Sequence, residues 1–236
     1  MLRTISSLAA VALAVLLPTA IAAPANATVV DTLAADMSTD FSYFGARTLA
    51  PGNSAAYVTV GLPDAEFGMT FGLNSVADVT PRARIQYGRG GRVGGIGFGM
   101  GTQLRMKVAR GGGWTAAIVG EPELAVHMFG EDHPPTTTTG LPSIAFTPLS
   151  AGIVADKQVL SDVRLVAGLK VPVTFYLRPE WIVNVPIIAE LGVESHIADN
   201  VVLLTRFDAG ADFYGPGGLP STHSYFRLRA GIGWGQ

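Results

Sequence analysis

The chain has 236 residues, a formal net charge of −2 and no cysteine. The absence of cysteine excludes a small disulfide-stabilised scaffold, and the near-neutral charge offers no electrostatic footprint for nucleic acid. Hydrophobic residues make up 48% of the chain and charged residues only 14%, against about 25% charged residues in soluble domains. Beyond residue 27, however, no apolar run is long enough to span a bilayer as a helix. This combination favours a protein that crosses a membrane with strands.

Residues 1–27 have the features of a secretory signal peptide. Arg3 provides the positive start, residues 8–17 form a short apolar run, and Ala25-Asn26-Ala27 offers a small-residue cleavage site, with 20–22 as an alternative. The apolar run is too short to cross a bilayer as a helix, so a retained N-terminal anchor is the weaker interpretation. We expect export and cleavage of this peptide.

Residues 28–53 do not alternate as a strand does, and Pro51-Gly52 near their end is a turn signal. Three interpretations remain open: a disordered leader, a short helix, or a segment that enters the barrel. We expect residues 28–53 to be an N-terminal periplasmic segment or plug. Its aromatic and basic side chains are Phe41, Tyr43, Phe44 and Arg47.

Residues 95–108 show the clearest pattern of the chain. Successive side chains of a strand point to opposite faces, and here one face is apolar while the other is polar or small. The apolar face holds Ile96, Phe98, Met100, Thr102, Leu104, Met106 and Val108. The other face holds Gly95, Gly97, Gly99, Gly101, Gln103, Arg105 and Lys107.

The same alternation recurs to the C-terminus and is typical of a membrane-spanning β-barrel. We therefore expect an all-β fold, an antiparallel transmembrane up-and-down β-barrel of about ten strands over residues 54–236. The predicted strands are 54–62, 65–73, 78–88, 94–109, 113–129, 143–156, 162–177, 180–195, 199–213 and 224–236.

Charged side chains within these strands all fall on the face opposite the apolar one. A charge at mid-bilayer costs roughly 2–4 kcal/mol, so we assign this face to the lumen. Buried ions must be paired, and we expect the charges to form an internal network. The predicted lumen network is Glu66, Arg82, Arg84, Arg105, Lys107, Glu121, Glu123, Arg164, Lys170, Glu190, Glu194, Arg206, Asp208, Asp212, Arg227 and Arg229.

Aromatic residues cluster near the strand ends and on the lipid-facing side. Barrels of this kind carry aromatic girdles at both membrane interfaces. Phe67 lies near the outer end of its strand. The predicted girdle residues are Tyr87, Trp114, Phe175, Trp181, Phe213, Phe226 and Trp234.

Connection lengths give the expected orientation. An even-stranded barrel has both termini on the periplasmic side, and its outer loops are the longer ones. The predicted inner turns are all short, near 74–77, 110–112, 156–161 and 196–199. The two longest connections, 130–141 and 215–223, then fall on the outer side.

The final strand ends with Arg229, Gly231 and Trp234, which resembles the C-terminal signature of bacterial outer-membrane β-barrel proteins; Gln236 stands where those proteins usually end in a hydrophobic residue. The pattern is similar to the small eight- to ten-stranded class, and no specific family is identified. This resemblance implies a monomer in the bacterial outer membrane, in contact with the lipid bilayer and inserted by the barrel assembly machinery.

The sequence contains no metal-binding or cofactor-binding motif, and we expect no cofactor. His127 is expected to face the lumen near its outer end, close to Glu131, Asp132 and His133, while Asp212 and His223 flank the last outer loop. Some ten-stranded outer-membrane enzymes place acidic residues and a histidine at this rim, where such a base could activate water or serine. An outer-membrane rim enzyme, a protease or lipid hydrolase, is therefore the alternative function.

Two patches of glycine face the lumen, at residues 95–101 and 231–235. Glycine can make room for large neighbours or ease strand curvature, and the second patch could admit residues 28–53 as a plug. Ten strands are closer to the side-chain-filled lumen of eight-stranded barrels than to a wide channel.

We therefore expect a non-enzymatic membrane barrel with a structural role, or a narrow pore for ions or small polar solutes. An exported soluble barrel that binds an apolar ligand would show the reverse pattern, with charges outside and apolar residues inside.

Overall fold

The computed structural model describes residues 41–87, 95–129, 143–177, 182–198, 200–215 and 222–235. The predicted signal peptide and residues 28–40 lie outside these residues. The strands are β1 (Ser54–Leu62), β2 (Asp64–Gly72), β3 (Ala77–Gln86), β4 (Gly95–Gly111), β5 (Trp114–Gly120), β6 (Glu123–Phe129), β7 (Ser143–Gln158), β8 (Val163–Tyr176), β9 (Ile182–Asn184), β10 (Ile187–Ala198), β11 (Val201–Gly215) and β12 (Thr222–Gly235).

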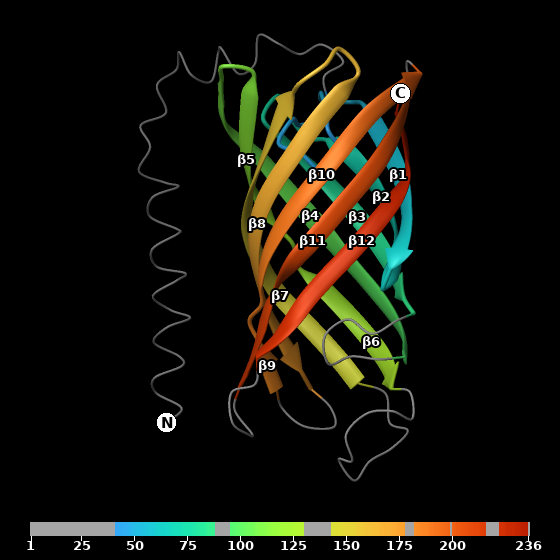
Figure 1. The fold of residues 1–236 in the computed structure, drawn as a ribbon, viewed down its shortest axis with the longest axis vertical. Helices are drawn as coiled ribbons and strands as arrows, with labels where there is room; N and C mark the ends of the chain where they lie inside the picture. Colours follow the sequence, from blue (N-terminus) through green and yellow to red (C-terminus); the bar gives the residue numbers. More distant parts are fainter. Residues whose placement is uncertain are drawn as a thin grey trace. The chain divides into compact units, whose positions relative to one another are not determined.

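The strands form one closed antiparallel barrel (Figure 1). Strands that are neighbours in the chain pair with one another, except β5 with β6 and β9 with β10. β12 pairs with β1, with Gly235 facing Ala55 and Leu228 facing Leu62. The closure leaves no open edge in the described barrel, so the backbone hydrogen bonds are satisfied within the wall, as a bilayer requires.

The barrel has ten strands because two of them are interrupted. β4 and β7 each pair with both β5 and β6, so β5 and β6 make one strand broken near Pro122. In the same way β8 and β11 each pair with both β9 and β10, which are separated by Val185 and Pro186. Proline cannot donate to a ladder and so interrupts it. The predicted fold of about ten strands is confirmed, with strand ends shifted by a few residues.

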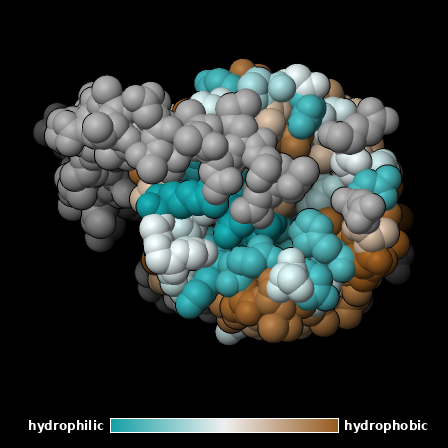
Figure 2. Space-filling view, turned by 90° about the horizontal axis from the view of Figure 1, so that it is seen from above, coloured by the Kyte–Doolittle hydropathy of each residue, from teal (hydrophilic) through white to brown (hydrophobic). Residues whose placement is uncertain are grey.

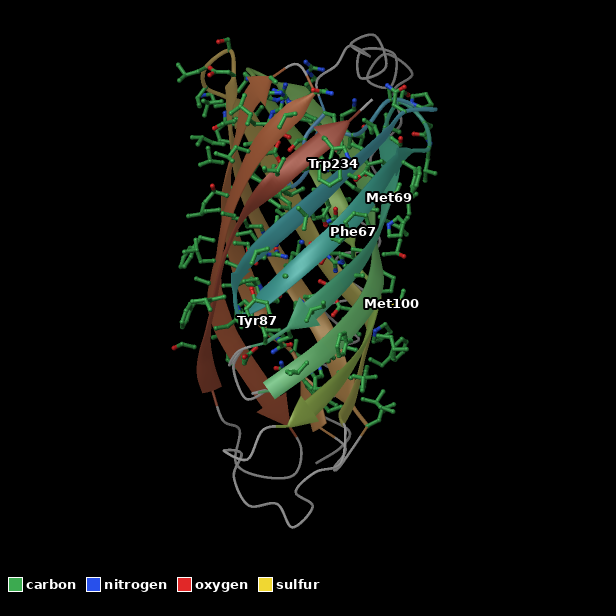
Figure 3. The ribbon with its side chains drawn as sticks, turned by 90° about the vertical axis from the view of Figure 1, so that its right-hand side faces the viewer. Phe67, Met69, Tyr87, Met100 and Trp234 are labelled. Carbon is green, nitrogen blue, oxygen red and sulfur yellow. The ribbon has the colours of Figure 1, made fainter. Side chains whose placement is uncertain are left out.

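The outer wall of the barrel is apolar. On β4 the Met100 side chain is 73% exposed, whereas Arg105 on the opposite face is 2% exposed. Figure 3 shows Phe67, Met69 and Trp234 on the outside of the wall. Large apolar side chains are exposed along every side of the barrel, which water disfavours and lipid accepts. The fold is therefore a transmembrane barrel, the inverse of a soluble ligand-binding one.

The two ends of the barrel differ. At one end, which we call the turn end, short connections join β2 to β3, β4 to β5, β7 to β8 and β10 to β11, and the C-terminus lies there as well (Figure 1). Gly112 and Gly113 make the β4–β5 turn with φ of 58° and 80°, values that favour glycine. At the opposite end, the loop end, β1, β3, β6, β8 and β11 finish.

The described residues contain no helix long and apolar enough to cross a membrane.

Candidate functional site

The lumen collects the charged side chains of the strands. All of the predicted lumen residues are buried or half-buried, and none is exposed. The buried ones are Glu66, Arg105, Glu121, Arg164, Lys170, Glu190, Glu194, Arg206, Asp208, Asp212 and Arg229. The half-buried ones are Arg82, Arg84, Lys107, Glu123 and Arg227.

Ion pairs run around the inside of the barrel as a closed ring, which we call the charge belt. Most of the contributing strands offer one sign of charge at this level, and β11 offers one residue of each sign. The belt consists of Asp64 and Glu66 on β2, Arg82 and Arg84 on β3, Glu121 and Glu123 flanking Pro122, Lys170 on β8, Glu190 on β10, Arg206 and Asp208 on β11, and Arg227 and Arg229 on β12.

One half of the belt joins β12 to the β5–β6 strand. Arg229 NH1 lies 3.0 Å from Glu66 Oε2, and on the same strand Asp64 Oδ2 lies 3.6 Å from Arg84 NH1. Arg84 in turn contacts Glu123. These contacts cross β1 and β4, which place no charge at this level.

The other half of the belt returns to β12. Lys170 contacts Glu121 and lies 3.1 Å from Glu190. Glu190 contacts Arg206, whose Nε lies 2.6 Å from Asp208 Oδ1.

Asp208 closes the ring, because its Oδ2 lies 3.6 Å from Arg229 NH2. Breaking a buried ion pair by removing one partner typically costs about 3–5 kcal/mol, but most belt carboxylates contact two or more cations and so keep a partner when one is removed. The belt therefore fixes the lumen at this level.

The glycines of β4 make room for the belt, as one of the sequence interpretations suggested. A Cβ on Gly99 would lie 3.0 Å from Glu123 Oε1, and one on Gly101 would lie 2.6 Å from the carbonyl oxygen of Pro122. A Cβ on Gly97 would lie 2.6 Å from His127 Nδ1. The absence of side chains on this face of β4 admits longer side chains from the β5–β6 strand.

Between the belt and the turn end, residues 41–49, which we call the N-terminal plug, occupy the lumen. Ser42, Phe44 and Ala46 are almost fully buried, although they belong to no strand. Figure 2 looks onto the turn end and shows hydrophilic residues gathered in its middle with hydrophobic ones at the rim. This part of the lumen is filled by backbone and side chains of the plug.

Glu194 is one of three buried carboxylates that hold the plug. It accepts hydrogen bonds from the backbone N–H of Phe44 at 2.7 Å and from the Ser42 hydroxyl at 2.9 Å. Arg164 lies 3.3 Å from Glu194 and also donates to the carbonyl oxygen of Phe41. The Arg164–Glu194 ion pair on the wall thus binds the first residues of the plug.

Asp156 and Asp78 hold the rest of the plug. Asp156 accepts from the backbone N–H groups of Ala46 and Arg47, and its other oxygen lies 2.7 Å from Arg47 Nε. Asp78 accepts from the N–H of Leu49 at 3.0 Å. Carboxylates from three separate strands therefore satisfy backbone groups that would otherwise be buried without partners.

Arg105 joins Asp78 to the plug. Its NH2 lies 2.6 Å from Asp78 Oδ2, and its NH1 donates to the carbonyl oxygens of Ser42 and Gly45 at 2.7 Å. The guanidinium also lies over the Phe41 ring. A single buried cation thereby contacts several residues in the first half of the plug.

One aromatic ring of the plug and one of strand β1 pack on glycines of the wall. Tyr43 lies against Gly233, where a Cβ would clash with the ring, and Tyr57 lies against Gly68 in the same way. The Phe44 and Tyr57 rings meet edge to face, with centroids 5.6 Å apart. Burial, and next the charge of Glu194, raise the pKa of Tyr43 well above its usual value, so its phenol stays neutral. The C-terminal glycine patch thus faces the plug.

Three lumen carboxylates escaped the sequence analysis. Asp64 and Asp78 stand at the first or second position of their strands, and Asp156 was the shared end of the predicted strand 143–156 and the predicted turn 156–161. The turn begins later than predicted, because β7 continues to Gln158, and the Asp156 side chain is fully buried. The alternation that placed Arg82 on the inner face also predicts that Asp78, four residues earlier, faces the lumen. Asp78 could therefore have been identified from the sequence.

Between the belt and the loop end lies a cavity of about 160 Å³. Besides belt residues, its wall includes His127, Tyr176, Asn184, Asp212 and Tyr225. The His127 and Tyr176 rings lie 6.4 Å apart, and Asn184 Nδ2 donates to Asp212 Oδ1 at 3.4 Å. Among the described residues, this half of the lumen contains unfilled space lined by several polar side chains, in contrast to the filled half.

The residues proposed for a rim enzyme are only partly described. His127 is buried in the cavity wall on β6, and Asp212 pairs in the backbone register with His223. The side chain of His223 and residues 131–133 lie outside the described residues. Among the described residues, no group of three or more histidine or acidic side chains is arranged to hold a metal ion.

The predicted girdle residues that are described lie on the outer wall. Trp181 falls outside the described residues. Phe175 is half-buried. The other described girdle residues are exposed: Tyr87, Trp114, Phe213, Phe226 and Trp234.

No family model and no curated protein matches the sequence. Among solved structures, the outer membrane protease OmpT from Escherichia coli has a TM-score of 0.47 at 7% identity, covering 78% of this chain and 93% of that one. The outer-membrane expressed OmpT of Vibrio cholerae has a TM-score of 0.34 at 11% identity, covering 89% and 74%. Its in-vitro folded form has a TM-score of 0.33 at 14% identity, covering 87% and 73%. At these values the likenesses are too distant to indicate an activity.

Proposed function

We propose that this chain is a monomeric, non-enzymatic protein of a bacterial outer membrane, exported by a cleaved signal peptide. The apolar outer wall, the closed sheet and the C-terminal motif around Trp234 support this proposal. The turn end would then face the periplasm, because both termini of an even-stranded barrel lie there. The barrel assembly machinery and the lipid bilayer are its expected partners.

The membrane location has a direct test on the outer wall. Met100→Arg places a charge where lipid tails are expected and should lower the free energy of unfolding by about 2–4 kcal/mol, measured by urea titration in lipid vesicles. Arg110→Met, at an exposed position of the turn end, serves as a control with little expected effect. A Met100→Arg protein of unchanged stability would contradict a lipid-facing wall.

Within that membrane, we propose a narrow pore for ions or small polar solutes that the N-terminal plug holds closed. The observation that carries this proposal is the anchoring of residues 41–49 by Glu194, Asp156 and Asp78, on three separate strands. Ten strands leave little space beyond their own side chains, so one short segment is enough to block the turn-end half.

The test is conductance across a planar bilayer. The mature chain should be silent or nearly so, whereas deletion of residues 28–50 should give discrete ion-conducting steps. Deletion of residues 28–40 alone keeps the plug and is the matched control, which should remain silent. A heat-dependent gel shift verifies that each barrel is folded.

Two outcomes would overturn the closed pore. Equal conductance with and without the plug would show that residues 41–49 do not close the path. Silence of the folded plug-deleted barrel would indicate that the charge belt seals the lumen by itself, and the protein would then have a structural role.

A further inference from the structure

The cavity at the loop end has the character of a ligand site. Its volume is about 160 Å³, and an apolar cavity of about 150 Å³ is enough to hold benzene. Here the floor is the charge belt and the wall is polar, so the occupant must be a small polar molecule. Which molecule fits depends on the polar atoms that lack partners.

One wall offers donors. Arg227 of β12 is the most loosely paired cation of the belt, with its Nε 3.4 Å from Asp64 and its NH1 3.8 Å from Asp208. Neither the Arg227 Nε nor the Tyr225 hydroxyl has a hydrogen-bond partner among the described residues. The Arg227 guanidinium lies 5.4 Å from the Tyr225 ring centroid. A carboxylate entering the cavity would find both groups on the same strand.

Two other walls offer acceptors. His127 on β6 and Asn184 on β9 are each 6% exposed. Within the described part of the chain, Asn184 Oδ1 has no hydrogen-bond partner, and neither has His127 Nδ1, which faces Gly97 of β4. The buried carboxylate of Asp212 lies beside Asn184 and adds negative charge. These groups suit an ammonium group, which carries donors only.

The topology separates these two sets of groups. Going round the barrel in either direction, four barrel strands lie between the strand that contains His127 and the strand that contains Arg227. His127 and Arg227 therefore stand on opposite walls, with Asn184 on an intermediate strand. A ligand that satisfies both walls must carry a donor-rich group at one end and an anionic group at the other.

We propose that the loop-end cavity binds a small zwitterion with one ammonium and one carboxylate group, of the size of an amino acid. Its carboxylate contacts Arg227 and the Tyr225 hydroxyl, and its ammonium contacts Asn184 Oδ1 and the His127 ring, both in the cavity wall. A site whose buried polar groups are left unpaired without ligand discriminates strongly in favour of molecules that pair them. The inference goes beyond the closed pore and holds whether or not the barrel conducts.

The test is ligand-detected saturation-transfer NMR on the folded mature chain in detergent micelles. The probes are glycine, β-alanine and 4-aminobutyrate, which differ in the separation of their charges. Acetate and ethylammonium, each with only one of the two groups, are the comparison ligands. At least one zwitterion should bind saturably, at least tenfold more tightly than either single-charge ion.

Two substitutions link binding to the proposed contacts. Arg227→Met and Asn184→Leu should each weaken binding of the zwitterion at least tenfold. Arg110→Met makes the same change at the turn end and should leave binding unaltered. If a variant fails to fold, Tyr225→Phe, which removes only a hydroxyl, should still weaken binding several-fold.

Three results would overturn the proposal: no zwitterion binds, acetate binds as tightly as the best zwitterion, or Arg110→Met weakens binding as much as Arg227→Met. Because the assay uses no bilayer, its failure leaves the conductance result untouched. Conversely, a barrel that never conducts would still be expected to bind.

Discussion

The two halves of the lumen are built from the same alternation of residues but differ in how tightly their charges are held. In the turn-end half, Arg105 lies 2.6 Å from Asp78 and also donates to plug carbonyl groups. In the loop-end half, Arg227 lies 3.4 Å or more from its carboxylate partners, and polar atoms such as His127 Nδ1 lack hydrogen-bond partners among the described residues.

The difference between the halves comes from the occupant. A backbone segment carries an N–H and a C=O at each residue, so the plug satisfies carboxylates and arginines together and removes free space. The loop-end half has no such segment among its described residues, and its charges pair only with one another. The filled turn-end half is suited to closing the path through the lumen. The loop-end half, with polar atoms that lack hydrogen-bond partners among the described residues, is suited to binding a small polar ligand.

The largest effect is expected from Arg105→Met in the filled half. It leaves Asp78 buried without its cation and removes three hydrogen bonds to the plug, so the free energy of unfolding should fall by about 3–5 kcal/mol. Urea titration in vesicles measures this loss. Adding Asp78→Leu removes the stranded charge and should restore part of the stability; no recovery in the double variant would contradict this explanation.

The packing of the plug on the wall gives the next largest effect. In Gly233→Ala the new Cβ would clash with the Tyr43 ring, and overpacking of this kind typically costs about 1–3 kcal/mol. Thermal gel-shift midpoints and bilayer conductance should show a less stable, partly opened barrel.

Gly120→Ala is the matched control, because a Cβ there meets nothing within 4 Å. Adding Tyr43→Ala to Gly233→Ala should relieve the clash. If Gly233→Ala behaves like Gly120→Ala, the plug does not press on this part of the wall.

Arg227→Met should have a smaller effect than Arg105→Met and so sharpens the contrast between the halves. Asp64 and Asp208 keep Arg84, Arg206 and Arg229 as partners, so the stability loss should be about 1 kcal/mol, close to the worth of one hydrogen bond. The same urea titration applies. A loss as large as that of Arg105→Met would show that the two halves are equally tightly held.

The smallest effect concerns pH. Because burial raises the pKa of Tyr43 in the folded state, the unfolded state loses this proton first, and the contribution of Tyr43 to stability should be constant below about pH 10 and fall above it. Unfolding titrations at pH 8 and pH 11 measure the slope. Tyr43→Phe should show a shallower fall than the parent chain, and an equal fall would exclude Tyr43 as a contributor.

Much of the barrel could be predicted from the sequence. The inward and outward faces follow from an alternation with a period of two residues, a local property of a strand, and the cost of a charge in lipid keeps Met100 and Arg105 on opposite faces. The same rule placed Glu66 and Arg229 on the inner face. The prolines Pro122 and Pro186 indicate breaks in their strands, but the strands 113–129 and 180–195 were predicted as continuous.

The tertiary structure alone decided which charges meet and what fills the lumen. Glu66 meets Arg229 only because closure of the barrel brings the first strand to the last, and the ring of ion pairs depends on that closure. Asp156 binds the plug from more than a hundred residues away, and no local pattern encodes such a contact. The sequence determined which face each side chain takes, because that choice is local, whereas the partners across the lumen depend on register, closure and the path of residues 41–49.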